Sequence, residues 1–232
     1  MRLDMTSKTN PTRSPLALRK DGDIEQVLTR ADPNLGRLIG VVVARAGVQR
    51  PAKSKATPFQ ALVRAVVYQS VAAEAAAAIY TRLRGAVSGP LTPLKIIRMT
   101  EGALRKVGVS SSKARAIHAL ADWFIANRST ARNIAELPDD AVAEALTVIP
   151  GIGVWTVNVF LIFNLQRLDV MPTADLGIRR GVQLIDRLDQ TPGPKEVRER
   201  ALRWRPYRSI ASMYLWHVVR LKITADDLTR TV

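Results

Sequence analysis

Apolar residues recur at intervals of three and four positions along most of the chain. Between residues 35 and 43 the recurring set is Leu35, Leu38, Ile39, Val42 and Val43. This spacing places the apolar side chains on one face of an α-helix. No stretch alternates apolar and polar residues as a half-buried strand does, and no internal repeat is visible. The pattern therefore predicts an all-α fold.

Helix-start and helix-stop residues divide this pattern into segments. Pro33 and Pro58 stand where the first turn of a helix favours proline, and stretches rich in Gly and Pro, such as residues 85–93 and 190–195, interrupt the chain. The predicted helices are residues 23–31, 33–43, 58–67, 72–83, 92–99, 100–107, 113–128, 141–148, 154–164, 176–186, 196–204 and 207–221.

The N-terminal segment, residues 1–21, differs from the rest of the chain. It is polar, mainly basic and without a periodic apolar pattern. Such a composition predicts a mobile basic arm. The arm either adds non-specific DNA affinity or is a solvated leader without a role. Residues 22–232 then form the folded domain.

Charge and composition narrow the class of protein. The 232 residues carry 35 Lys and Arg against 20 Asp and Glu, a formal net charge of +15, and 47% of them are hydrophobic. A folded chain with this charge favours a polyanionic partner, the other interpretation being a solubilising surface. No run approaches the ~18 apolar residues that cross a membrane, and the N-terminus lacks an apolar signal core. We therefore expect a cytoplasmic, nucleoid-associated protein, and a monomer because no heptad pattern occurs.

The lack of cysteine restricts the chemistry further. The chain contains no Cys and two His, His118 and His217, which do not have the spacing of metal ligands. Disulfides, thiol catalysis and Cys-ligated zinc or iron–sulfur clusters are therefore excluded. We expect that no cofactor is required.

Two short segments in residues 146–181 carry candidate chemistry. Residues 149–153, I-P-G-I-G, join two predicted helices. The glycines permit a tight turn that exposes backbone N–H groups at a helix start, which is a seat for an anion such as a nucleic-acid phosphate. Residues 172–175, P-T-A-D, precede a third predicted helix, whose dipole favours an ionised Asp175 carboxylate. Taken separately, the first segment is an ordinary connection and the second an ordinary N-cap.

Together these segments resemble a known family. The pattern L-x-x-I-P-G-I-G-x-W-T-x-N in residues 146–158, followed by a proline and then Asp175, resembles the helix-hairpin-helix (HhH-GPD) DNA glycosylases. Within that superfamily it is most similar to the alkylpurine branch, the 3-methyladenine DNA glycosylase II type. Two further segments support the likeness, Y-Q-S-V-A-x-x-A-A from residue 68 and W-R-P-Y-R-S with Y-L-W from residue 204. The resemblance implies a two-lobed all-α fold with the active-site cleft between the lobes, a hairpin at residues 141–164 and a catalytic loop at residues 169–181.

The resemblance also implies roles for residues of the site. Asp175 matches the catalytic Asp, whose carboxylate stabilises positive charge on the sugar as the base leaves. The matching base pocket consists of Trp155, Trp216, Val159 and Leu176. The bacterial alkylpurine enzyme has tyrosines at the last two positions, so this pocket is less aromatic. Trp155 stands where strand-cutting relatives have a Schiff-base lysine, which implies a monofunctional enzyme that leaves an abasic site.

Other matching positions concern double-stranded DNA. The residues implied to contact it are Gly151, Gly153, Val154, Thr156, Gln69, Ser70 and Lys113. Ser70 matches the residue that is wedged into the gap left by a flipped base, although serine is small and polar for that purpose. Lys113, at a helix start, either holds a second phosphate or simply follows an N-cap at Ser112. The backbone carbonyls of Thr147, Ile149 and Ile152 match those that hold a structural Na⁺ or K⁺ in the family.

The expected reaction is the hydrolytic excision of alkylated purines such as 3-methyladenine and 7-methylguanine. These rings are cationic and leave readily, and aromatic faces bind them by stacking and cation–π attraction. Two alternatives remain open. One is a related glycosylase for deaminated or oxidised bases, and the other is a non-catalytic protein that binds damaged DNA through the same hairpin. The second alternative would be expected to lack a carboxylate at position 175, which this chain retains.

Overall fold

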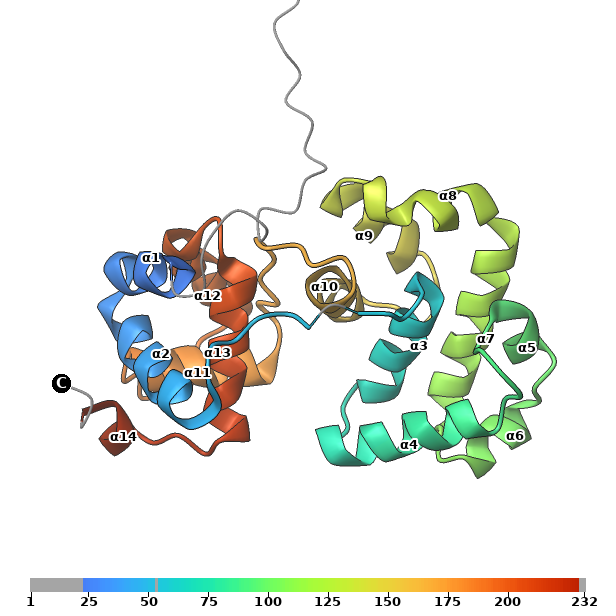
Figure 1. The fold of residues 1–232 in the computed structure, drawn as a ribbon, viewed down its shortest axis with the longest axis horizontal. Helices are drawn as coiled ribbons and strands as arrows, with labels where there is room; N and C mark the ends of the chain where they lie inside the picture. The colour runs from blue at the N-terminus through green and yellow to red at the C-terminus, as the bar shows by residue number, and fades with distance from the viewer. Residues whose placement is uncertain (1–22, 53, 230–232) are drawn as a thin grey trace, which may run out of the picture.

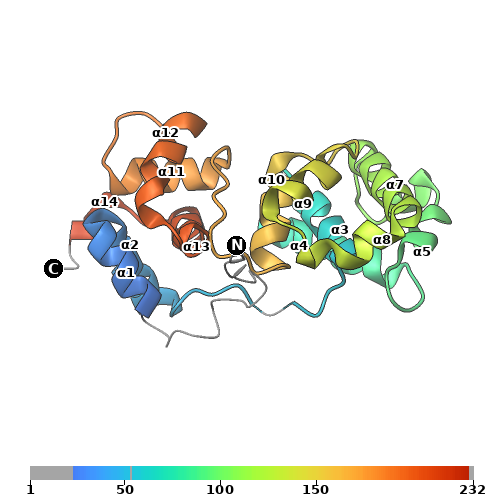
Figure 2. The same ribbon diagram turned by 90° about the horizontal axis from the view of Figure 1, so that it is seen from above.

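The computed structural model describes residues 23–52 and 54–229, and within these ranges the regular structure is helical with no strand. The helices form two lobes, and α10 (Val154–Phe163) lies on the side of one lobe that faces the other (Figures 1 and 2). The all-α fold is therefore confirmed. The predicted arm, residues 1–21, lies outside the described residues.

One lobe combines the beginning of the described chain with its end. Its helices are α1 (Asp23–Ala31), α2 (Pro33–Ala46), α11 (Leu176–Ile185), α12 (Pro194–Arg200), the 3₁₀ turn η3 (Ala201–Trp204), α13 (Arg208–Arg220) and α14 (Ala225–Thr229). The fully buried Leu38, Trp204 and Tyr214 belong to its core. Helices α11 and α13 lie close together because Gly181 has no side chain, and a Cβ there would be 2.9 Å from the Leu215 Cβ. This close packing fixes the two helices that carry Asp175 and Trp216.

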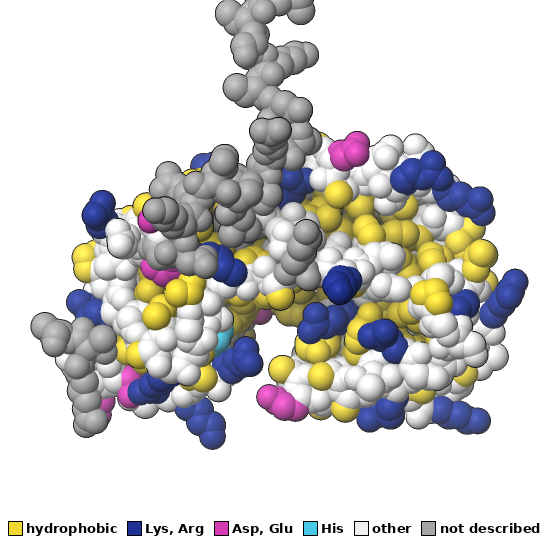
Figure 3. All heavy atoms as spheres, viewed as in Figure 1, with side chains coloured by type: hydrophobic (Ala, Val, Ile, Leu, Met, Phe, Trp, Pro, Cys, Tyr) yellow, Lys and Arg dark blue, Asp and Glu magenta, His cyan; other side chains and the backbone are white. Residues whose placement is uncertain are grey.

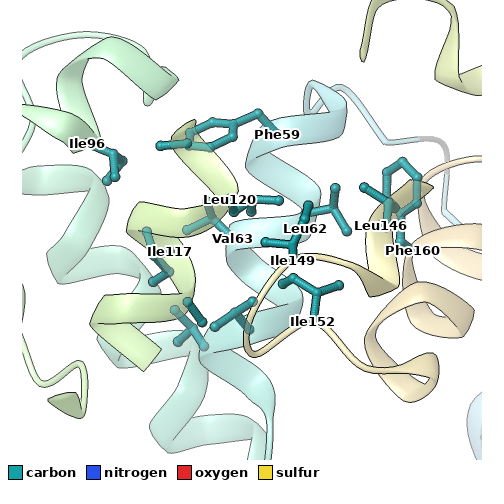
Figure 4. Packing of buried hydrophobic residues seen from close by; sticks show 14 of the residues in the cluster. Phe59, Leu62, Val63, Ile96, Ile117, Leu120, Leu146, Ile149, Ile152 and Phe160 are labelled. Atoms are coloured by element: carbon teal, nitrogen blue, oxygen red, sulfur yellow. The ribbon is translucent and has the colours of Figure 1, made fainter. Parts of the chain in front are cut away.

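The middle of the chain forms the other lobe. Its helices are α3 (Pro58–Tyr68), α4 (Ala73–Gly85), α5 (Pro93–Ile97), α6 (Glu101–Lys106), α7 (Ser111–Ala126), α8 (Arg128–Asn133), the 3₁₀ turn η2 (Ile134–Glu136) and α9 (Asp139–Thr147). Leu62, Val63, Ile117 and Leu120 are fully buried in its core, where α3 packs on α7 (Figure 4). This lobe supports the turn between α9 and α10.

The two lobes are connected by side chains as well as by the chain itself. Phe163, at the end of α10, and Trp216, on α13, pack against both hydrophobic cores. The segment between α2 and α3 is bound to both sides. The backbone N–H of Gln49 donates to the Tyr214 hydroxyl at 3.2 Å, and the Asn164 amide donates to the Ala56 carbonyl at 3.1 Å. Packed aromatic side chains and hydrogen bonds therefore hold the two lobes together.

Ion pairs join three segments of the first lobe through Asp32, Asp186 and Arg200. The Asp32 carboxylate caps α2, accepts the Trp204 indole N–H at 2.7 Å and pairs with Arg200, which also binds Asp186. Burial alone would raise the pKa of both carboxyl groups. The hydrogen bonds and charge of Arg200 outweigh burial, so the pKa values of Asp32 and Asp186 lie below their ordinary value.

Each predicted helical segment occurs, with three differences. The predicted helix 196–204 is divided into α12 and the 3₁₀ turn η3, and the short helices α8 and α14 were not predicted. The prediction that Ser112 caps α7 is wrong, because Ser110 is the N-cap and its hydroxyl accepts the Lys113 N–H at 3.4 Å. None of the helices in the described ranges has the length and apolar character that crossing a bilayer requires.

Candidate active site

A turn between α9 and α10 presents bare backbone at the surface. Ile149 and Ile152 are each 3% exposed and point into the core of the second lobe (Figure 4). These two anchors hold the intervening Gly151 at the tip with a φ of +85°, a conformation that glycine adopts without strain. Among the described residues, no acceptor takes the N–H groups of Gly151, Gly153 and Val154. The turn is therefore shaped to receive an anion at the N-terminus of α10.

Gln69 fastens this turn to the end of α3. Its Nε2 donates to the Gly151 carbonyl at 3.0 Å and to the Thr156 hydroxyl at 2.8 Å. The Thr156 side chain is buried, so this hydroxyl is turned away from solvent. In this geometry Gln69 and Thr156 hold the hairpin in shape, and the backbone N–H groups are what the hairpin offers to a ligand.

Ser70 and Lys113 occupy different surroundings. Ser70 is exposed in the turn between α3 and α4 and has a φ of +52°. The Lys113 ammonium donates to the Val67 carbonyl at 2.8 Å, at the C-terminal end of α3, and burial lowers its pKa. The structure thus gives Lys113 a helix-capping contact within the protein.

The Asp175 carboxylate accepts hydrogen bonds from three uncharged donors. It is the N-cap of α11, where its Oδ1 accepts the Ile178 N–H at 2.9 Å. The same oxygen accepts the Trp216 indole N–H at 2.9 Å, and Oδ2 accepts the Trp155 indole N–H at 2.6 Å. The three residues predicted from separate motifs therefore meet at one carboxylate, from α10, α11 and α13. The ordinary N-cap role and the candidate site coincide in this residue.

The indole of Trp216 is held on two sides. Its ring stacks on Phe163 with centroids 5.6 Å apart and an interplanar angle of 27°. Gly177 lies against its other edge, where an added Cβ would be 3.1 Å from Trp216 Cδ1 and 3.1 Å from Asp175 Oδ1. Sequence reasoning missed Phe163 and Gly177, because their importance depends on contacts between separate helices.

The loop that leads to Asp175 is bound to the start of α13. Arg208 pairs with Asp169, its Nε 2.7 Å from Oδ1, and its Nη2 donates to the Asp169 carbonyl at 2.9 Å. The Ser209 hydroxyl accepts the Val170 N–H at 2.9 Å. These contacts explain why a segment without regular structure can position a carboxylate.

The surroundings of the carboxylate combine apolar surface with positive charge. Leu176 is 49% exposed beside Asp175, and Val159 is half-buried on α10. Figure 3 shows Lys and Arg side chains on both lobes beside the notch that separates them. Positive charge on both lobes would attract an anionic polymer to this face of the molecule.

Comparison with protein families agrees with this geometry. The model of the HhH-GPD superfamily of base excision DNA repair proteins matches residues 63–206, which include the hairpin and Asp175. The chain belongs to this superfamily.

HhH-GPD relatives cover most of the chain. DNA-3-methyladenine glycosylase 1 of Schizosaccharomyces pombe is 35% identical over 199 residues, which are 84% of this chain and 86% of that protein. DNA-3-methyladenine glycosylase 2 of Escherichia coli is 29% identical over 197 residues, 79% of this chain and 64% of that protein. The structure of the Schizosaccharomyces pombe enzyme in complex with abasic DNA superposes with a TM-score of 0.77 at 32% identity, covering 85% of this chain and 96% of that one.

This HhH-GPD chain has no iron–sulfur cluster, because it has no cysteine to bind one. In the described part of the chain, no three His, Asp or Glu side chains are grouped closely enough to hold a metal ion.

Proposed function

We propose that this protein is a monofunctional DNA glycosylase that excises alkylated purines, such as 3-methyladenine and 7-methylguanine, from double-stranded DNA. The observation that carries the proposal is the Asp175 carboxylate, held between two indoles at the junction of the lobes. Support comes from the relatives in Schizosaccharomyces pombe and Escherichia coli, both of which are named as DNA-3-methyladenine glycosylases. The place of action is then the chromosomal DNA, which in a bacterial cell is the nucleoid.

The geometry suits hydrolysis of a base–sugar bond. A base inside a duplex cannot reach Asp175, so the nucleotide must first be flipped outward. As the bond breaks, its electron pair moves to the alkylated ring and neutralises that cation, while positive charge develops at the sugar C1′. The Asp175 carboxylate stabilises this charge. Water then adds to C1′ and gives up a proton, which leaves an abasic site.

The pocket residues determine which bases are accepted. The rings of Trp155 and Trp216 offer aromatic faces to an electron-poor base, with Val159 and Leu176 completing an apolar wall. Trp155 has no amine that could form a Schiff base, so the DNA strand stays intact. The neutral adenine and guanine rings leave far less readily than methylated cations, which gives selectivity without a dedicated acid.

In the proposed function, the hairpin between α9 and α10 binds the DNA backbone. A phosphate binds the N–H groups of Gly151, Gly153 and Val154. The family's monovalent cation fits the same turn, because the Ile149 carbonyl accepts one hydrogen bond, from the Ile152 N–H at 3.0 Å, and keeps a second lone pair. The carbonyls of Thr147, Ile149 and Ile152 would hold Na⁺ or K⁺, which adds positive charge beside the phosphate. Replacing K⁺ by a bulky organic cation at constant ionic strength should then weaken DNA binding.

One experiment tests the function directly. Methylpurine release is measured from alkylated duplex DNA with the native protein and with Asp175→Asn, and the DNA is then examined for strand breaks without heat or base. We expect release by the native protein, a loss of at least about a hundredfold in the variant, retained DNA binding and intact strands. Binding without release of methylpurines by the native protein would contradict the proposal. The assay would then be repeated on deaminated and oxidised bases, and failure there would leave the binding-only alternative.

A further inference from the structure

Three hydrogen bonds to Asp175 use neutral donors. Two come from indole N–H groups and one from the Ile178 backbone. Among the described residues, no Lys, Arg or His forms an ion pair with this carboxylate. This arrangement contrasts with Asp32 and Asp186, whose negative charge is balanced by Arg200.

The difference matters for a reaction that develops positive charge on the substrate. A neutral N–H donor holds the carboxylate in place through a hydrogen bond and leaves the full negative charge available to the sugar. A guanidinium at hydrogen-bond distance would bind the carboxylate more strongly but would cancel much of its field at C1′. A half-buried carboxylate that must present its negative charge to the substrate is therefore best held by neutral donors.

The hydrogen bonds also fix the direction of the carboxylate. An ionised carboxylate has about four lone-pair sites. The bonds from Ile178 and Trp216 fill both sites on Oδ1, and Trp155 takes one on Oδ2. One site on Oδ2 is left for the sugar or for the attacking water. The indoles come from different helices, so their N–H groups also define the rotation of the carboxylate about its own axis.

We infer that the indole N–H groups of Trp155 and Trp216 are positioning groups that orient the Asp175 carboxylate toward the sugar, independently of any stacking of their rings on a base. This inference rests on the proposed function and extends it to the two N–H groups. Its test must remove the N–H while the aromatic ring stays.

The first pair of variants is Trp155→Phe and Trp216→Phe, with Trp123→Phe as a matched control. Trp123 is a half-buried indole on α7 that packs edge-on against Phe124, away from Asp175. A second pair replaces each site tryptophan by benzothienylalanine, which has nearly the same size and stacking surface but carries sulfur in place of N–H. Far-UV circular dichroism, thermal unfolding and binding to duplex DNA with an abasic analogue check that each variant folds.

The main readout is the single-turnover rate of methylpurine release at saturating protein, with spontaneous release subtracted, measured beside the dissociation constant for duplex DNA with the abasic analogue. Loss of one hydrogen bond to a charged group should lower the rate about tenfold to a hundredfold. The dissociation constant should stay at the native value, because the carboxylate is still present and the rings still stack. The loss of rate in the double replacement should exceed that in either single one, and Trp123→Phe should match the native protein.

Two results would overturn the inference. The benzothienylalanine variants could retain the native rate, or they could lose rate only in proportion to a loss of DNA binding. Failure of the proposed function looks different, because Asp175→Asn would then release methylpurine as the native protein does, or neither would release any.

Discussion

Gly151→Ala tests how the hairpin keeps its shape. The residue has a φ of +85°, and a Cβ built on it would lie 2.4 Å from the Ala116 Cβ on α7. The backbone conformation costs an L-residue about 1–2 kcal/mol, and forcing the methyl group against a buried helix costs about 1–3 kcal/mol. We therefore expect a loss of about 2–5 kcal/mol in the free energy of unfolding, a large share of the 5–15 kcal/mol that is typical of a domain.

Gly153→Ala is the matched control, two residues further along the same turn. Gly153 has a φ of −99°, and an added Cβ would meet nothing within 4 Å. Alanine is a poorer N-cap than glycine by up to about 1 kcal/mol, but it also reduces the entropy of the unfolded chain by about 0.4–1 kcal/mol. The net change should stay within about 1 kcal/mol.

Urea unfolding followed by circular dichroism measures both variants, and Ala116→Gly completes a double-mutant cycle with Gly151→Ala. Removing the Ala116 methyl group relieves the clash and not the backbone strain. The cycle should therefore show a favourable coupling of about 1–3 kcal/mol. The reasoning is refuted if Gly151→Ala is as stable as the native protein, or if the two substitutions are additive.

Three further predictions concern the network, the hairpin and the site. Arg200→Met should lower the free energy of unfolding by about 3–5 kcal/mol at pH 7, because it leaves the buried Asp32 and the half-buried Asp186 without an ion-pair partner. The low pKa values of Asp32 and Asp186 stabilise the native fold above the ordinary carboxyl pKa, so the difference between native and variant should shrink as urea unfolding is repeated below about pH 4. Gln69→Ala should lower the free energy of unfolding by about 1–2 kcal/mol and weaken DNA binding in a filter or anisotropy assay, since it releases the hairpin tip. Gly177→Ala should slow methylpurine release roughly tenfold to a hundredfold with little change in thermal midpoint, because the added Cβ would lie 3.1 Å from both Asp175 Oδ1 and Trp216 Cδ1 and displace them. An unchanged rate would show that these two side chains move aside without loss of activity.

Local rules predicted the elements of this protein well. The start of α3 at Pro58, the N-cap position of Asp175 and the turn at Gly151 depend on backbone preferences of a few neighbouring residues. The same rules failed at Ser112, because Ser110 and Ser112 are both suitable N-caps and the local sequence does not choose between them. They also failed for α8, which buries none of its side chains and so has no apolar stripe.

The side-chain partners were beyond sequence reasoning for a different reason. Gln69 and Thr156 were expected to face DNA, but they bind each other across 87 positions of the chain. The resemblance placed Trp155 and Trp216 near Asp175 without indicating that both indole N–H groups point at its oxygens. Such contacts depend on how α10, α11 and α13 pack, and helical periodicity describes only which face each helix buries.

The position of Trp155 links the two tasks that the proposed function requires. It stands two residues after Gly153, in the first turn of α10, next to Val154, one of the residues whose backbone N–H group is proposed to bind a phosphate. Its indole reaches Asp175 at the N-terminus of α11, on the other lobe. Under the proposed function, one helical turn therefore contributes both to phosphate binding and to the direction of the carboxylate. Because Asp175 lies outside the hairpin, at the start of α11, substitutions at Asp175 should leave phosphate binding intact. A change in the backbone conformation of the hairpin would be expected to weaken phosphate binding and to displace the Asp175 carboxylate.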